Sequence, residues 1–297
     1  MTLEVGGMMG AGVAALVAGL VLVRPRFRAA SGAGKAVVLG PVFDATALAI
    51  FAAEHFLAAR DLAPIVPRWL PSPLFWTYFV GAALLAAAIS FIAWRHVRWS
   101  ASLLALLFVI IVVTIDLPNL PKGAHDRFFW ILTVRELTFA SGAMVLAGSL
   151  WPRGSAAGMA LMRLGRGFVA ATMVFYGIEH FLFPLNVPGV PLEKMTPAWV
   201  PAPTLLAYLV GIILLAGGVG LIIHPMVPAA GARRTIQAAA AGAGMMLLLL
   251  TVFFYLPIFV MEIHTPLAVE GINYVGDTLL FAGTVLLAGF GAERLTV

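Results

Sequence analysis

Two copies of a Glu-His pair are the residues of the sequence best suited to chemistry. Glu54-His55 and Glu179-His180 each lie near the end of an apolar segment, and each pair is followed by a phenylalanine. An ionised carboxylate among apolar residues costs free energy unless it is paired or hydrated, so such acids mark functional positions. A carboxyl beside an imidazole can also exchange protons near neutral pH. Both pairs therefore predict a site that binds a polar group or moves protons.

Each pair is followed along the chain by another histidine and another acid. His125 and Glu136 follow the first pair, and His264 and Asp277 follow the second. Adjacent positions on a helix point about 100° apart, so the two members of a pair cannot aim at one point without help from another element. We expect the loop histidines, His125 and His264, to supply that help.

A metal site is one function that these residue types allow. Two imidazoles and a carboxylate can hold iron, zinc or copper and leave positions open for a substrate. The candidate metal ligands are His55, His125, His180, His264, Glu54 and Glu179. A haem held between His55 and His180 is a further alternative.

A quinone or proton-relay site is the second function, because the same groups can donate and accept protons. The candidate residues for such a cofactor are Glu54, His55, Glu179, His180, Glu136 and Asp277. The third alternative is structural: the pairs would cap helix ends and bond to backbone groups of the loops. The residues alone leave all three open.

The two later acids differ in their surroundings. Arg135 stands beside Glu136, whereas Asp277 has no basic neighbour. We expect either an internal ion pair of Arg135 with Glu54 or Glu136, or a role of Glu136 and Asp277 in facing a substrate. Asp44 lies near the opposite end of its apolar segment from Glu54 and is expected to be solvated.

The elements that position these residues are predicted to be membrane-spanning helices. The chain has 297 residues, of which 62% are hydrophobic and 10% charged, and its mean hydropathy is +1.03. These values exclude a water-soluble globular protein and a disordered chain. The 18 basic residues are scattered, which excludes a nucleic-acid-binding patch. The absence of cysteine excludes a disulfide and a thiol relay within the chain.

The predicted fold is all-α, a polytopic membrane protein with nine transmembrane helices and the lipid bilayer as its partner. A span needs about 20 apolar residues. Such runs occur at 5–23, 36–57, 74–94, 101–117, 128–150, 167–183, 204–223, 235–256 and 273–291. The short loops on one side of the membrane hold twelve basic residues, and those on the other side hold five. Arg135 lies inside a span. Because basic loops stay in the cytoplasm, the N-terminus is predicted outside, the C-terminus inside, and the Glu-His pairs near the outer face.

An internal duplication relates the two halves of the chain. Glu-His-Phe recurs at a shift of 125 residues, Trp-x-Pro-x-Pro (69–73 and 199–203) at 130, and Leu-Pro (117–118 and 256–257) at 139. Glu136 matches Asp277 at a shift of 141. We therefore expect an N-terminal helix with a basic loop (1–35) and two four-helix units, 36–150 and 166–297. Units with an even number of spans start on the same side, so the repeats are predicted to be parallel.

The pattern Gly-x-x-Phe, Glu-His-Phe and a Pro-rich loop with Trp-x-Pro, carried on four helices, resembles the DoxX-like membrane proteins. The resemblance covers about 36–150 and 166–291. It implies a four-helix module of the bacterial inner membrane, often linked to quinone or sulfur redox systems. The resulting expectation is a redox-associated subunit that binds a quinone or metal near its outer face. The alternatives are a non-catalytic scaffold or assembly subunit of a larger membrane complex, and a small-solute transporter.

Overall fold

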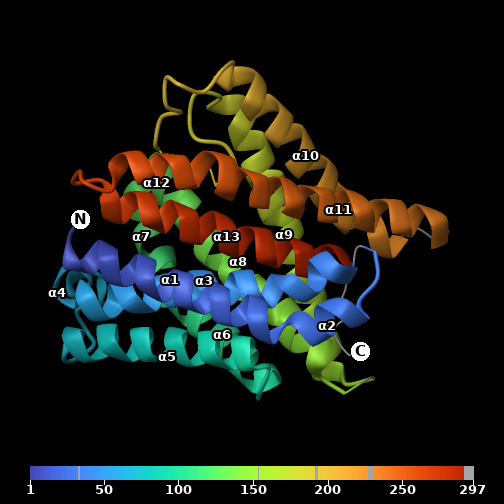
Figure 1. Cartoon of the computed structure of the whole chain (residues 1–297), viewed down its shortest axis with the longest axis horizontal. Helices are drawn as coiled ribbons and strands as arrows, with labels where there is room; N and C mark the ends of the chain where they lie inside the picture. Colours follow the sequence, from blue (N-terminus) through green and yellow to red (C-terminus); the bar gives the residue numbers. More distant parts are fainter. Residues whose placement is uncertain (33, 153, 191–192, 227–229, 291–297) are drawn as a thin grey trace.

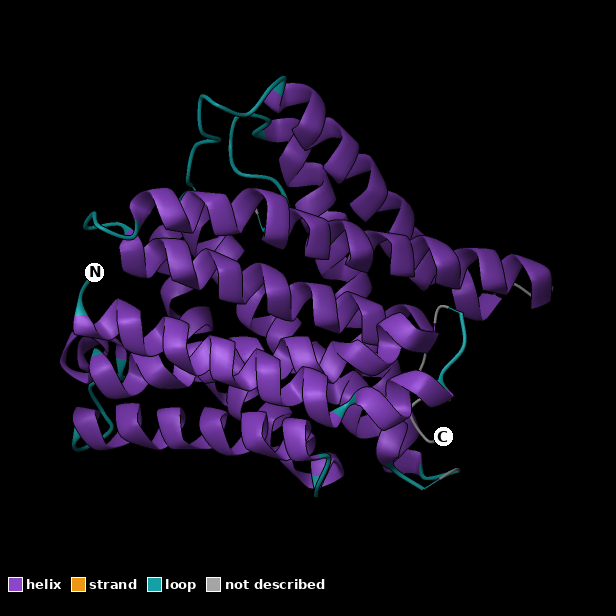
Figure 2. Ribbon diagram, viewed as in Figure 1, coloured by secondary structure: helices purple, strands orange, loops and turns teal. Residues whose placement is uncertain are grey.

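The computed structural model describes residues 1–32, 34–152, 154–190, 193–226 and 230–290. In these ranges the chain forms helices and no strand (Figure 2). Arg153 and Arg294, which the count of basic residues includes, and the end of the predicted second unit at 291–297 lie outside them.

Nine helical segments of the described residues are long and apolar enough to cross a membrane, as the sequence predicts. The helices that make up these segments are α1 (Leu3–Leu22), α3 (Gly34–Leu57), α5 (Pro73–Ala93), α6 (Val97–Ile111), α8 (Arg127–Leu150), α9 (Ala156–Leu182), α10 (Pro203–Ile223), α11 (Ala230–Leu250), α12 (Leu256–Glu262) and α13 (Ala268–Phe290). The short helices α2 (Arg24–Ala29), α4 (Ala59–Leu62) and α7 (Leu117–Asn119), with the 3-10 turns Ala63–Ile65, Leu120–Gly123 and His224–Met226, lie between or at the ends of these segments.

Two π-helical turns carry the fourth and eighth segments beyond their predicted ends at 117 and 256. The turns are η2 (Val112–Asp116) and η5 (Thr251–Tyr255), and each is followed by a Leu-Pro pair. Proline lacks an N–H, and its ring clashes with the carbonyl four residues earlier. A wider π turn relieves this clash, so the two segments continue to Gly123 and Glu262.

Helix α13 lies at the centre of the molecule and is buried along almost its whole length (Figure 1). It packs along α3 and α11 and also contacts α8. Helix α8 in turn packs along α6 and α9, and α1 packs along α3. The first helix of each predicted unit thus contacts the last helix of the other: α3 lies on α13, and α9 lies on α8.

Small residues permit the close approach of α3 and α13. A Cβ atom at Gly283 would lie 2.8 Å from the carbonyl oxygen of Gly40. The carboxyl of Asp44 also lies against Gly283, and Asp44 is only 5% exposed. The expectation that Asp44 is solvated was therefore wrong, because α3 is covered at this level by α13 and by its other neighbours.

Candidate functional site

A cavity of about 620 Å³ is lined mostly by the first half of the chain. Its walls come from α3, α5, the α6–η2 segment and α8, with two residues of α13, and residues of the 62–70 connection cover it. Most of the lining is apolar, and much of that is aromatic: Phe51, Trp69, Trp76, Phe79, Phe108 and Phe139. A lining of this kind suits the ring or tail of an apolar ligand.

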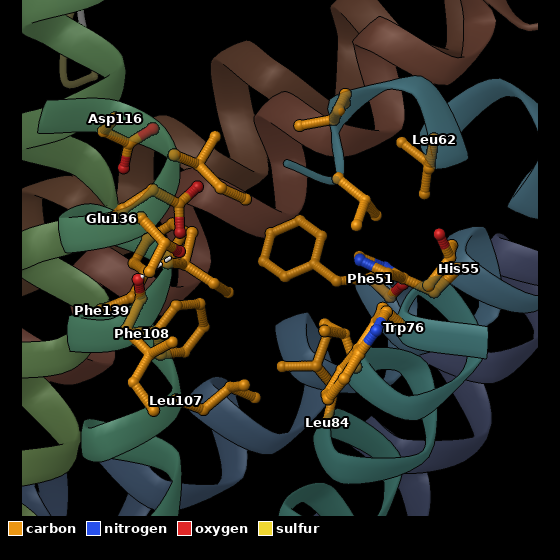
Figure 3. Close-up of a pocket in the computed structure, with 18 of the residues that line it drawn as sticks. Phe51, His55, Leu62, Trp76, Leu84, Leu107, Phe108, Asp116, Glu136 and Phe139 are labelled. Carbon is orange, nitrogen blue, oxygen red and sulfur yellow. Dashed lines mark hydrogen bonds between the residues drawn. The ribbon is translucent and has the colours of Figure 1, made fainter. Parts of the chain in front are cut away.

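Polar side chains are placed on opposite walls of this cavity. Figure 3 shows Asp116 and Glu136 on one wall, His55 and Trp76 on the other, and the ring of Phe51 between them. Glu54 also lines the cavity. Both members of the first Glu-His pair therefore reach one cavity, although their helix positions point in different directions.

Glu136 of the first half and Asp277 of the second half both form an ion pair with Arg135. Arg135 Nη2 donates to Glu136 Oε1 at 3.0 Å, and Arg135 Nη1 donates to Asp277 Oδ2 at 3.0 Å. The predicted ion pair of Arg135 with Glu136 is confirmed, whereas Glu54 accepts a hydrogen bond from Asn273 Nδ2 at 2.8 Å. These contacts join α3, α8 and α13 at the base of the cavity.

Four side chains of the lining carry a buried polar atom that has no hydrogen-bond partner among the described residues. The atoms are Trp76 Nε1, Asp116 Oδ2, Arg135 Nε and Asn273 Oδ1. Buried polar groups without partners are uncommon in folded proteins, and a bound molecule with its own donors and acceptors would satisfy them. Trp76, Asp116 and Asn273 were not predicted as site residues from the sequence. Asp116 could have been found as the acid immediately before the repeated Leu-Pro pair.

The second Glu-His pair has the structural role that the sequence left open. Glu179 forms an ion pair with Arg127. His180 is 1% exposed, its Nδ1–H donates to the carbonyl oxygen of Tyr176, and its Nε2 accepts the backbone N–H of Gly189 at 2.8 Å. Since both ring nitrogens are occupied, His180 is not available to bind haem iron opposite His55.

The loop histidines do not join the Glu-His pairs. His125 is exposed and lines a separate cavity together with Arg127 and Glu193. His264 is also exposed, with its Nδ1 3.0 Å from the terminal nitrogen of Met1. Within the described part of the chain, no three His, Asp or Glu side chains are close enough to hold a metal ion. The predicted metal-ligand set is thus not assembled there.

One family model matches part of the chain. It is described as a domain of unknown function (DUF8561) and matches residues 44–117. This stretch runs from Asp44 in α3 through α5, α6 and η2, so it contains three walls of the cavity. No curated protein and no solved structure matches the chain. The resemblance to DoxX-like proteins stays a prediction.

Proposed function

We propose that this chain is an integral membrane protein whose first half binds an amphipathic, quinone-class molecule near the outer face. The cavity carries this proposal: about 620 Å³ of mostly aromatic and aliphatic lining, with unpartnered polar atoms on its walls. The head group would lie against the ring of Phe51, between the walls that carry His55 and Asp116 and beside Arg135. The aromatic side chains would hold the ring.

The location near the outer face is supported by the distribution of basic residues. Five basic residues lie in or beside the connections on the side of the 62–70 segment, and twelve lie in or beside those on the opposite side. Basic residues favour the cytoplasmic side of a membrane. We therefore place the N-terminus and the mouth of the cavity outside and the C-terminus in the cytoplasm of a bacterial-type inner membrane.

Several features support the proposed parallel duplication. The π turns η2 and η5 lie 139 residues apart. Ser72 and Ala202, at the predicted shift of 130, both have a positive φ and precede the proline that begins α5 and α10. The packing of α3 on α13 mirrors that of α9 on α8, as a twofold axis between the units requires.

Filling the cavity tests the proposal. Ile111 lines the cavity and is only partly exposed, so Ile111→Trp would occupy space that the ligand needs. Leu106 lies on the same helix, is 54% exposed and does not line the cavity, so Leu106→Trp is the matched control. After purification in mild detergent, we expect solvent extraction to recover quinone from the wild type and from Leu106→Trp, and much less from Ile111→Trp. Equal recovery from all three would contradict the proposal.

The second candidate function is a non-catalytic scaffold or assembly subunit. The structural use of the second Glu-His pair favours it, because Glu179 and His180 secure the chain's own helices and loop. A purified wild type that contains no quinone, and that binds none when quinone is added, would support this function.

A further inference from the structure

In the second half, a segment of the chain itself lies against the second Glu-His pair and the π turn η5. The connection between α9 and α10 turns inward at Val187–Val190, and both valines are 1% exposed or less. The peptide between Pro188 and Gly189 is bound on both sides: Gly189 N–H donates to His180 Nε2 at 2.8 Å, and the Tyr255 hydroxyl donates to the Pro188 carbonyl oxygen at 2.5 Å.

The surroundings of Gly189 correspond to the walls of the cavity. A Cβ atom at Gly189 would lie within 4 Å of Leu247, Leu250 and Tyr255. At the shift of 139 that relates the π turns, their counterparts are Phe108, Ile111 and Asp116, and all three line the cavity. The connection between the Glu-His pair and the Trp-x-Pro motif is longer by five residues in the second half, because the shift rises from 125 to 130. The extra length lets this connection reach inward.

The two imidazoles are held in the same way. His55 Nδ1–H donates to the carbonyl oxygen of Phe51 at 2.8 Å, as His180 Nδ1–H does to that of Tyr176. Each ring therefore offers the lone pair of Nε2 as an acceptor. In the second half, His180 Nε2 accepts the N–H of Gly189. In the first half, the corresponding acceptor, His55 Nε2, would bind a donor group of the ligand.

The residue that faces the histidine from the π turn differs between the halves: it is Tyr255 in the second half and Asp116 in the first. Tyr255, the last residue of η5, donates its hydroxyl to a carbonyl of the inserted segment. Asp116 is the last residue of η2, and its Oδ2 is buried without a partner among the described residues. A carboxylate accepts hydrogen bonds and does not donate them. The change from tyrosine to aspartate therefore replaces a donor on the wall with an acceptor.

From this comparison we propose that the cavity selects a ring compound with two hydrogen-bond donors, the quinol form rather than the quinone form of its ligand. One hydroxyl donates to His55 Nε2 and the other to Asp116. This inference rests on the proposed function and specifies which form of the ligand is bound. The inserted Pro188-Gly189 peptide, with one acceptor and one donor, is the internal counterpart of that ligand.

The test compares three forms of one ring by equilibrium dialysis, under anaerobic conditions, with the full chain in detergent. The probes are an alkylated benzohydroquinone, the corresponding benzoquinone and the hydroquinone dimethyl ether, which keeps the ring but has no donor. We expect the hydroquinone to bind at least about tenfold more tightly than either other probe, the range expected for one or two net hydrogen bonds.

Variants test whether Asp116 and His55 cause the preference for hydroquinone. Asp116→Leu and His55→Phe each remove one acceptor, and we expect each to reduce the preference for hydroquinone severalfold. Asp61→Asn, at an exposed position of α4, is the control and is expected to keep the wild-type preference. Thermal unfolding of every variant shows that it is folded.

The failure of this inference is distinguishable from that of the proposed function. The selection of donors is overturned if the wild type binds hydroquinone and quinone equally. It is also overturned if the preference is unchanged in both Asp116→Leu and His55→Phe. Either result would leave the cavity as a quinone-class site. Binding of none of the three probes would overturn both.

Discussion

Asp277 on α13 is paired with Arg135 on α8, with 3.0 Å between Oδ2 and Nη1. Asp277 is 1% exposed, and the two residues lie 142 positions apart in the chain. The pair therefore joins the two halves through a contact that local sequence cannot encode. It also fixes the base of the cavity, since both residues line it.

Removing this arginine is expected to destabilise the protein strongly. Arg135→Gln would leave Asp277 and Glu136 without their cation, and breaking a buried ion pair on one side costs about 3–5 kcal/mol. The measurement is the free energy of unfolding in detergent. Arg60→Gln, at an exposed position of α4, should change it little. The double variant Arg135→Gln with Asp277→Asn should recover part of the loss. A double variant less stable than Arg135→Gln would count against this account.

The contact of α3 with α13 depends on a glycine. In Gly283→Ala the new Cβ would meet the Gly40 carbonyl oxygen at 2.8 Å, so the helices must separate or strain. We expect a loss of about 1–3 kcal/mol, as for other overpacked contacts. Gly242→Ala is the matched control, because nothing lies within 4 Å of its Cβ. Alanine is the better helix former, so Gly242→Ala should keep or raise the melting temperature. A melting temperature of Gly283→Ala that is no lower than that of Gly242→Ala would contradict the role of the contact.

The two histidines of the Glu-His pairs should respond differently to the same substitution. His180→Ala leaves the buried N–H of Gly189 without its acceptor, which costs about 1–3 kcal/mol. His55→Ala removes a side chain that lines the cavity, and its main effect should be on ligand binding. Limited proteolysis of the 184–202 connection and the melting temperature distinguish them. If His55→Ala lowers stability as much as His180→Ala, the two pairs have the same role.

The absence of cysteine makes the topology directly testable. Asp61→Cys places a thiol in the connection that we assign to the outside, and Arg95→Cys places one at an exposed position on the basic side. In intact cells, a membrane-impermeant maleimide should label Asp61→Cys, whereas Arg95→Cys should be labelled only after the membrane is permeabilised. The reverse pattern would invert the proposed orientation.

The apolar runs were sufficient to predict the nine segments, because about 20 apolar residues in a row have few alternatives to a helix. The fourth and eighth segments were predicted to end too early, at 117 and 256, since the sequence does not reveal that a π turn can accommodate the proline that follows. Glu54, His55 and Glu136 were predicted in one set, and all three line the cavity. Asp277 was predicted with Glu179 and His180 but lines the same cavity as Glu54, because α13 packs between the two halves. The different role of Glu179 and His180 was not visible, because it depends on where the 184–202 connection folds.

The packing of α13 also bears on how the site is made. Asn273 and Asp277 complete the wall of a cavity whose other sides come from α3, α5, α6 and α8, and α13 is synthesised after all of these. A nascent chain interrupted before residue 268 would hold Arg135 and Glu136 but not Asp277. During biogenesis the lining of the cavity is therefore completed only after α13, the last of the nine apolar segments, has packed against α3 and α8.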